Sequence, residues 1–426
     1  MQRKAVIIGA GLIGTTTAWY LAERGFEVTV LERREGPGRE TSFANGGLLT
    51  PSEADPWNAP GTLGQLLRWL GREDSPLLLR PSALPGMLRW GLEFLRASRS
   101  APHLRSTSTI LALALYSLRA LDELDRQLSL KYDRLSNGTV KIFRERKALD
   151  EALKLADSLK PLGLDSRLMK PDEAVKLEPA LAAVSEHLVG AIHYPGDASG
   201  DAYLFTCELH ARALAAGVIF RFNTVVKDMR GDGMQIQSLT TSDGDISADA
   251  YVLAAGSYSP QLVKPLKLRL PIYPVKGYSV TLTSPDNLSV HVPIVDFEQK
   301  IVITPLGQRI RIAGTAEFNG YDTGLNQARG KNMLRQAVRI LPELEQPAGQ
   351  GEGIHWTGLR PMTCDGPPIL GASPYRNLFF NTGHGPLGWT LCAGSSRLVA
   401  DLVAGAAPAM DISGCSFNRF MHPLLG

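Results

Sequence analysis

Three glycines and one acid near the N-terminus have the spacing of a dinucleotide-binding site. Gly9, Gly11 and Gly14 form a G-x-G-x-x-G pattern, and Glu32 stands 18 residues after its last glycine. Gly9 allows a tight exit from a strand, Gly11 lets the backbone approach a pyrophosphate, and Gly14 lets a helix pack closely on the sheet. Peptide N–H groups at the helix start would hold the phosphates, and Glu32 would accept hydrogen bonds from ribose hydroxyls.

The residues around this pattern predict the elements that position it. An apolar, β-branched run at 5–8 is typical of a buried parallel strand, and the spacing over 15–24 predicts a helix that stops at Gly25. A second strand is predicted at 28–31 and ends in Glu32. Strand, glycine turn, helix, strand and acid therefore follow in the order that the glycine pattern needs.

A second glycine-rich turn predicts a cofactor that is held at both ends. An apolar strand precedes the segment 382–388, and a helix is predicted over 389–403. The start of this helix could hold the negative charge of a reduced flavin, so two separated helix starts favour FAD. The loop at 40–49 combines small residues, hydroxyls and an Asn-Gly-Gly stretch, and could run along the same cofactor. Two arginines directly after Glu32 leave NADP open, and an NAD(P) reductase is the alternative.

The composition of the 426 residues is that of an ordinary globular protein of two or three domains. It is 44% hydrophobic and 20% charged with a net charge of +3, which predicts no nucleic-acid partner. The four cysteines form no C-x-x-C pair, which predicts no metal site and favours a reducing, cytoplasmic compartment. The basic and apolar N-terminus imitates a secretory signal, but cleavage there would destroy the glycine pattern. No run of residues predicts a membrane span.

Several longer motifs resemble those of FAD-dependent D-amino-acid dehydrogenases, within the group that includes D-amino-acid oxidase and glycine oxidase. The resemblance extends over essentially the whole chain. The matching segments are Glu-Thr-Ser-Phe-Ala-Asn-Gly at 40–46, Trp-Thr-Gly-Leu-Arg-Pro-Met-Thr at 356–363, Asn-Thr-Gly-His-Gly at 381–385, Gly-Trp-Thr at 388–390, Phe-Arg-Phe-Asn-Thr at 220–224 and Pro-Val-Lys-Gly-Tyr-Ser at 274–279. Two residues depart from the family pattern: Cys364 stands where a proline usually follows the threonine, and Pro386 replaces a small hydroxyl residue.

The resemblance implies oxidation of an amino acid at Cα–N, with hydride passed to flavin N5 and hydrolysis of the imino acid to a 2-oxo acid and ammonia. It implies that Arg360 clamps the substrate carboxylate, because the planar guanidinium pairs bidentately with a carboxylate. Tyr278 would bind that carboxylate or shape the pocket. His384 would lie near the flavin at a helix start, where the helix dipole disfavours its protonation, and would act as an uncharged positioning group. FAD is expected to be non-covalent, although some relatives attach flavin through cysteine, which draws attention to Cys364. Lys276 lies in another segment expected to line the pocket, as does Lys300.

The predicted cofactor-binding residues follow from the glycine patterns and the resemblance together. They are Gly9, Gly11, Ile13, Gly14, Glu32, Arg33, Thr41, Ser42, Asn45, Gly46, Gly47, Leu48, Val226, Ala255, Gly256, Gly383, Gly385, Leu387, Gly388, Trp389 and Thr390.

The dispersal of these motifs predicts an α/β protein with a discontinuous, Rossmann-like FAD domain of the glutathione-reductase type. Its pieces are expected at 1–85, 170–265 and 355–426. A substrate domain with a mixed or antiparallel sheet is expected at 86–169 and 266–354, with strands near 272–282, 301–305 and 309–313 and helices near 108–130 and 146–160.

The electron acceptor implied by the resemblance is a quinone or another respiratory acceptor. Residues 62–105 agree with this, because seven arginines stand there against three acidic residues, among many leucines and two tryptophans. Such a stretch could lie on the inner face of an anionic membrane, or could form a helical subdomain with solvated arginines.

Two other functions remain open from the sequence. One is an oxygen-dependent amine oxidase of the same group that acts on glycine, sarcosine or a hydroxyproline. The other is a flavin-binding subunit of a larger dehydrogenase complex.

Overall fold

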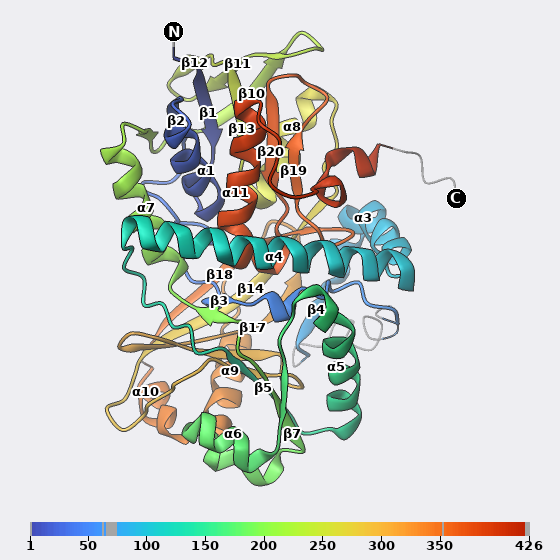
Figure 1. Ribbon diagram of the computed structural model, residues 1–426, viewed down its shortest axis with the longest axis vertical. Coiled ribbons are helices and arrows are strands. Elements are labelled where there is room, and N and C mark those ends of the chain that lie inside the picture. The colour runs from blue at the N-terminus through green and yellow to red at the C-terminus, as the bar shows by residue number, and fades with distance from the viewer. Residues whose placement is uncertain (1, 62–63, 65–74, 352, 422–426) are drawn as a thin grey trace.

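The computed structural model describes residues 2–61, 64, 75–351 and 353–421 and is built around two sheets, one above the other in Figure 1. The upper sheet has six strands, all parallel to their neighbours except the antiparallel edge strand β19. Its order is β19 (Ile369–Ala372), β20 (Leu378–Thr382), β13 (Ala250–Leu253), β1 (Lys4–Ile8), β2 (Glu27–Leu31) and β9 (Ile219–Arg221). The predicted N-terminal strands are confirmed.

The side-chain alternation of β1 explains how this sheet is covered on both faces. Ala5 and Ile7 belong to the buried cluster formed with three helices, whereas Val6 and Ile8 belong to the cluster on the opposite face. The helices are α1 (Leu12–Glu23), α7 (Ala202–Ala215) and α11 (Gly388–Ala404). The opposite face is covered by a three-stranded meander of β10 (Val226–Gly231), β11 (Ile236–Thr241) and β12 (Gly244–Ile246), followed along the chain by α8 (Ser259–Val263).

The lower sheet is mixed and mostly antiparallel, as predicted. Its order is β18 (Ile354–Thr363), β14 (Ile272–Thr283), β17 (Arg309–Phe318), β16 (Ile301–Leu306), β15 (Ile294–Asp296), β5 (Thr139–Phe143), β7 (Gly190–Tyr194) and β6 (Arg167–Met169), with β4 (Leu77–Leu79) paired to β17. The helices of this part of the molecule are α5 (Arg146–Leu159), α6 (Pro171–Leu177), α9 (Gln327–Ile340) and α10 (Glu345–Gly349). A small pair, β3 (Leu48–Leu49) with β8 (Ala198–Ser199), lies between the two sheets in Figure 1.

The long helix α4 (Ser100–Leu128) crosses the molecule where the two parts meet, and α3 (Leu84–Ala97) precedes it (Figure 1). It packs directly on α11, since the N–H of Gly394 donates to the Ser117 hydroxyl at 2.9 Å. A Cβ at Gly394 would lie 2.8 Å from Ser117 Cα, so this contact needs glycine.

The sheet memberships differ from the predicted domain boundaries at several places. Strands β4, β7 and β18 fall largely in the ranges expected for the FAD domain, yet all three pair within the lower sheet. Helix α4 falls in the range expected for the substrate domain, yet packs on α11. An apolar strand pattern predicts a strand but does not determine its partner, which explains the difference.

Candidate active site

A cavity of about 960 Å³ lies between the two sheets, and glycine-rich segments from both ends of the chain line it. Its wall includes residues that follow β1, the loop before β3, the turn after β13 and the segment that leads into α11. The cavity also reaches strands β14, β16, β17 and β18 of the lower sheet. It can therefore receive an extended ligand along the upper sheet and a second, smaller ligand against the lower sheet.

Each of the three N-terminal glycines is required for a different structural reason. Gly9 has φ of +106°, and a Cβ there would lie 2.7 Å from the Ala254 carbonyl oxygen. A Cβ at Gly14 would lie 1.8 Å from the Gly9 oxygen, so Gly14 serves helix–strand packing and does not line the cavity. Gly11 does line it, immediately before α1, and its Cβ would approach Ser42 Oγ to 3.3 Å.

Glu32 lines the cavity at the end of β2 and holds the glycine turn in place. One carboxylate oxygen accepts the Ala10 N–H at 2.8 Å and the other accepts the Arg34 N–H at 2.9 Å. Burial raises the pKa of Glu32, while these two hydrogen bonds oppose the rise. Its neighbour Arg33 stacks on the Tyr258 ring, with Cζ 3.7 Å from the ring centroid.

The loop at 41–48 is held against the lower sheet by hydrogen bonds. Thr41 donates its hydroxyl hydrogen to the Leu359 carbonyl at 2.8 Å, and the Asn45 side chain accepts the N–H of Gly47 at 3.0 Å. Thr304 of β16 donates to the carbonyl of Gly46 at 2.7 Å. Thr41 and Asn45 thus shape the loop backbone along the cavity.

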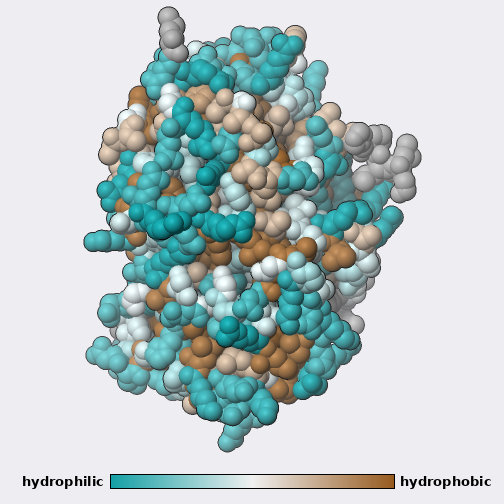
Figure 2. Space-filling view, viewed as in Figure 1, coloured by the Kyte–Doolittle hydropathy of each residue, from teal (hydrophilic) through white to brown (hydrophobic). Residues whose placement is uncertain are grey.

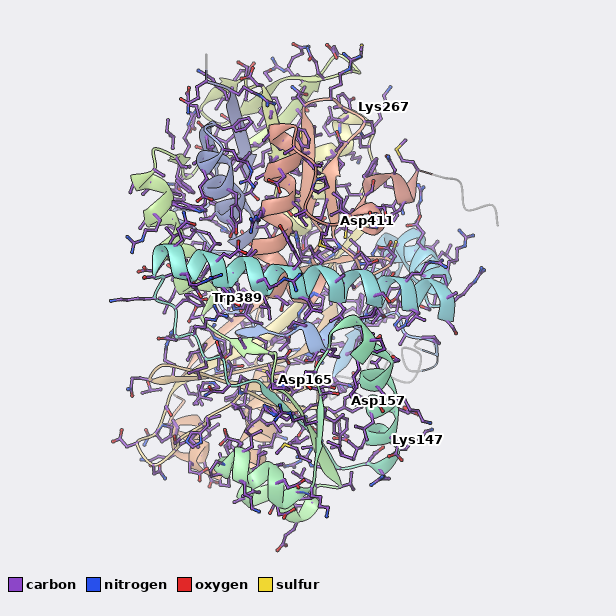
Figure 3. All side chains as sticks on the ribbon, viewed as in Figure 1. Lys147, Asp157, Asp165, Lys267, Trp389 and Asp411 are labelled. Carbon is purple, nitrogen blue, oxygen red and sulfur yellow. The ribbon has the colours of Figure 1, made fainter. Side chains whose placement is uncertain are left out.

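His384 lies at the other end of the cofactor part of the cavity, just before α11. Its side chain is 4% exposed, and Nε2 is 3.0 Å from the Ser395 hydroxyl. Burial lowers the pKa of His384 to about 3, so the imidazole is neutral at ordinary pH. The sequence predicted a neutral histidine from the helix dipole, but the cause here is desolvation. Trp389, below α4 in Figure 3, lines the cavity and donates its indole N–H to the Gly200 carbonyl at 3.0 Å.

Arg360 projects from β18 into the lower part of the cavity. Its Nη1 donates to the Thr315 carbonyl at 3.3 Å, and its guanidinium lies 5.6 Å from the Trp57 ring centroid. Burial lowers the pKa of Arg360 to about 10. Among the described residues, Arg360 forms no ion pair with a carboxylate, so its charge is available to a ligand.

Tyr278 is 2% exposed and shares a buried cluster with Met333 of α9. Its hydroxyl donates to Glu317, and although burial raises the pKa of Glu317, contacts from Tyr278, Arg80 and Lys276 lower it overall. Tyr278 borders the cavity, and these contacts favour the pocket-shaping role over direct binding of a carboxylate.

The two lysines singled out in the sequence have different surroundings. Lys276 is 1% exposed, and its Nζ bonds Asp322 at 2.7 Å and the Gly324 carbonyl at 3.1 Å, so its charge is paired away from the cavity. Lys300 lines the cavity with Nζ 3.6 Å from the Phe297 ring centroid, and burial lowers its pKa.

Most of the residues predicted as cofactor-binding line this cavity. Besides Gly14, the exceptions are Gly383 and Thr390. Thr390 accepts the Thr50 N–H at 3.0 Å, and a Cβ at Gly383 would lie 2.7 Å from Thr363 Cγ2, so both support the wall from behind. The residues that do line it are Gly9, Gly11, Ile13, Glu32, Arg33, Thr41, Ser42, Asn45, Gly46, Gly47, Leu48, Val226, Ala255, Gly256, Gly385, Leu387, Gly388 and Trp389.

Among the cavity residues that the sequence did not single out are Trp57, Gly277 and Thr315, which surround the Arg360 guanidinium. Gly277 lies in one of the matching motifs, and its lack of a side chain was the available clue. Cys364 is 3% exposed, lies away from the cavity wall, and burial raises its pKa, so it is poorly placed for attachment of a flavin. The described part of the chain holds no group of three or more metal-binding side chains.

Comparisons with known proteins agree with this geometry. The family described as "FAD dependent oxidoreductase" matches residues 4–402. A D-amino acid dehydrogenase of Paramagnetospirillum magneticum is 47% identical over 98% of this chain and 99% of its own length. One of Dechloromonas aromatica is 43% identical over 95% of this chain and 98% of its own.

Two solved structures have a similar fold. Glycine oxidase from Geobacillus kaustophilus superposes with a TM-score of 0.75 and 25% identity, covering 99% of this chain and all of that one. The L-proline dehydrogenase from P. horikoshii superposes with a TM-score of 0.78 over 99% of this chain and 98% of that one, and at 17% identity it shows the fold alone.

Proposed function

The chain belongs to the family of FAD-dependent oxidoreductases, and from this premise we propose that it is a D-amino-acid dehydrogenase. It would convert D-amino acids to 2-oxo acids and ammonia. The observation that carries the proposal is the buried Arg360, which pairs with no carboxylate in the described ranges and lies in a cavity that also has the features of an FAD site.

The cavity fits FAD through the backbone on both of its sides. Gly11 leaves an open cradle at the start of α1, where a side chain would approach Ser42, and the residues that open α11 line the opposite part. Glu32, Arg33 and the loop at 41–48 would hold the adenosine end and the length of the cofactor. When bound, FAD supplies the acceptor for the hydride that leaves the substrate Cα.

Arg360 would bind the substrate carboxylate as a bidentate pair and so fix the direction of the Cα–H bond. The neighbouring Trp57 and Gly277 border the space around the guanidinium. Because its pKa is lowered to about 3, His384 would stay uncharged and help to shape the flavin side of the site. We assign no side chain as base: the substrate reacts as the neutral amine, and water takes the proton released from nitrogen.

The test is anaerobic flavin bleaching by a panel of D- and L-amino acids, glycine and hydroxyprolines. The proposal expects bleaching by D-amino acids and slow reoxidation in air. Rapid peroxide release in air with glycine or sarcosine would instead favour the oxidase alternative. The similarity to glycine oxidase is the observation that supports this alternative. A protein that holds FAD but is bleached by none of these substrates would indicate a non-catalytic subunit.

Arg360→Ala is expected to raise the KM for a D-amino acid at least about 100-fold while FAD stays bound, because it removes a charged bidentate pair. Arg212→Ala is the matched control, since Arg212 is exposed on α7 and away from the cavity wall. An unchanged KM in Arg360→Ala would refute the clamp.

For the electron acceptor we propose a membrane quinone reached from residues 62–105. Of these, residues 62–63 and 65–74 lie outside the described residues. On α3, Leu84, Leu88 and Leu92 are 43, 66 and 52% exposed and recur every four residues, so they share one helix face, while Trp90 is buried. Exposed leucines beside arginines suit an anionic lipid surface.

No helix in the described ranges has both the length and the apolar character needed to span a bilayer. Flotation with vesicles containing anionic lipid tests surface attachment. We expect Leu88→Asp with Leu92→Asp to abolish flotation without changing amino-acid-dependent bleaching. Failure of the unchanged chain to float would refute the attachment but not the dehydrogenase activity.

A further inference from the structure

Strand β17 has one extra residue at the point where it changes partners. Across β14, Ala316 pairs with Gly277 and Gly314 pairs with Tyr278, so Thr315 between them is left without a partner. On its other edge β17 pairs with β16 as far as Gly314 and with β4 from Ala316 onward. Thr315 is therefore a β-bulge at the point where β17 meets β14, β16 and β4.

The backbone of Thr315 is in a conformation that threonine rarely adopts. Its φ is +48°, in the left-handed region where a β-branched side chain is a genuine outlier. Such a conformation persists only where the surroundings enforce it, and it clusters at functional sites. Thr315 also lines the cavity.

A buried arginine from α9 enforces this conformation. Arg329 is 3% exposed, and its Nη2 donates to the Thr315 hydroxyl, to the Ser75 carbonyl at 3.1 Å and to the Ala316 carbonyl at 3.3 Å. The Thr315 hydroxyl in turn donates to the Pro76 carbonyl at 3.0 Å. The side chain of the bulged residue is thus held on the side of α9.

The carbonyl of the same residue receives Arg360. Arg360 starts on β18, opposite Val275 of β14, and its Nη1 reaches the Thr315 carbonyl on β17 at 3.3 Å. The guanidinium therefore crosses the middle strand. It does so over Gly277, where a Cβ would lie 2.5 Å from Cζ.

We propose that the Thr315 bulge, held by Arg329, is a positioning device that aims Arg360 at the substrate carboxylate. The inference rests on the proposed function, because it assumes that Arg360 binds a carboxylate. A regular strand would direct this carbonyl into the sheet ladder, whereas the bulge frees it from the β14 register. A neutral carbonyl orients the guanidinium but leaves its charge for the substrate, which an aspartate or glutamate at this place would not.

The experiment measures the Kd of propionate, a carboxylate without an amine, from the absorbance change of the FAD holoenzyme. Thr315→Gly permits the positive φ but removes the hydroxyl that Arg329 and Pro76 hold. Arg329→Met removes the donors to that hydroxyl. Thr315→Ser keeps the hydroxyl, and Arg360→Ala removes the clamp itself.

We expect Thr315→Gly and Arg329→Met each to raise the Kd of propionate about tenfold, a change of about 1.4 kcal/mol. Thr315→Ser should stay within about twofold of the unchanged enzyme, and the melting temperature of Thr315→Gly should not fall. A purely structural role would lower the melting temperature and flavin content without this selective loss of carboxylate affinity.

The outcomes separate the inference from the proposed function. If Arg360→Ala weakens propionate binding while Thr315→Gly and Arg329→Met do not, the positioning role is overturned and the clamp stands. If Arg360→Ala has no effect either, both are overturned. If Arg329→Met does not fold, the comparison of Thr315→Gly with Thr315→Ser decides.

Discussion

Replacing Gly277 with alanine should damage the site while leaving the fold intact. The new Cβ would lie 2.5 Å from Arg360 Cζ and 2.6 Å from both Nη atoms, whereas ordinary contacts begin at 3.4 Å. The guanidinium must therefore move by about 1 Å, and a misplacement of that size costs roughly 100-fold in rate. The backbone itself tolerates alanine, because Gly277 does not have a positive φ. Alanine in a strand is favoured over glycine by about 0.5–1 kcal/mol, so unfolding should not become easier.

The assay is anaerobic stopped-flow reduction of the flavin at several concentrations of a D-amino acid, with a melting curve of each protein. We expect the second-order rate constant for reduction to fall about 100-fold in Gly277→Ala. Gly91→Ala is the matched control, since a Cβ there meets nothing within 4 Å and Gly91 lies on α3. A rate constant within about threefold of the unchanged enzyme, with the melting temperature retained, would show that the guanidinium position over Gly277 is not the productive one.

Three further predictions concern protonation and the cofactor cradle. The pKa of His384 in the folded protein, about 3, lies below its unfolded value, so its contribution to stability is present above pH 6.5 and is lost as pH falls toward 3. His384→Gln should therefore weaken the dependence of the free energy of unfolding on pH between 6.5 and 3. Burial raises the pKa of Asp197 to about 7, so ionisation of this carboxyl lowers the free energy of unfolding as pH rises from about 4 to 7. Asp197→Asn, whose amide can donate to the Ser52 and Thr139 hydroxyls, should flatten the dependence of the free energy of unfolding on pH in that range. Chemical denaturation at several pH values measures both. Gly11→Val should lower the flavin-to-protein absorbance ratio of the purified protein, because its side chain would fill the cradle beside Ser42, and full flavin occupancy would contradict that assignment.

The cofactor half of the site could be predicted because its signals are local. The turn after β1, the helix start and Glu32 lie within one short stretch, and each residue type has one clear geometric reason. The predicted strands and helices near the cavity appear with shifts of a few residues at most, with two exceptions. Helix α4 begins eight residues before the expected start, and β17 ends five residues after the expected end. The same local signals could not show that β7 and β18 join the lower sheet, since strand pairing depends on partners far along the chain.

The arrangement of the substrate half of the site depends on how strands far apart in the chain pair. The sequence therefore allowed fewer predictions there. Gly277 lies beneath Arg360 only because β14 pairs with β18 in one particular register. Thr315 lies two residues after the strand expected at 309–313, and nothing in the sequence there marks an extra residue or a positive φ. The neutral state of His384 was predicted, but its cause, burial, required the packed structure.

The distribution of charge across β14 supports the proposal that Arg360, and not Lys276, binds the substrate. On one face of this strand, Lys276 contacts Glu317 and Asp322, and Tyr278 donates to Glu317, so these groups satisfy one another. On the other face, Arg360 lies over Gly277 with a neutral carbonyl as its partner. Burying a cation without a counter-ion costs free energy, and here burial lowers its pKa. On the proposed function, a substrate carboxylate would offset that cost on binding. The affinity of the site for carboxylates would then come from a charge that the described part of the chain leaves without a counter-ion.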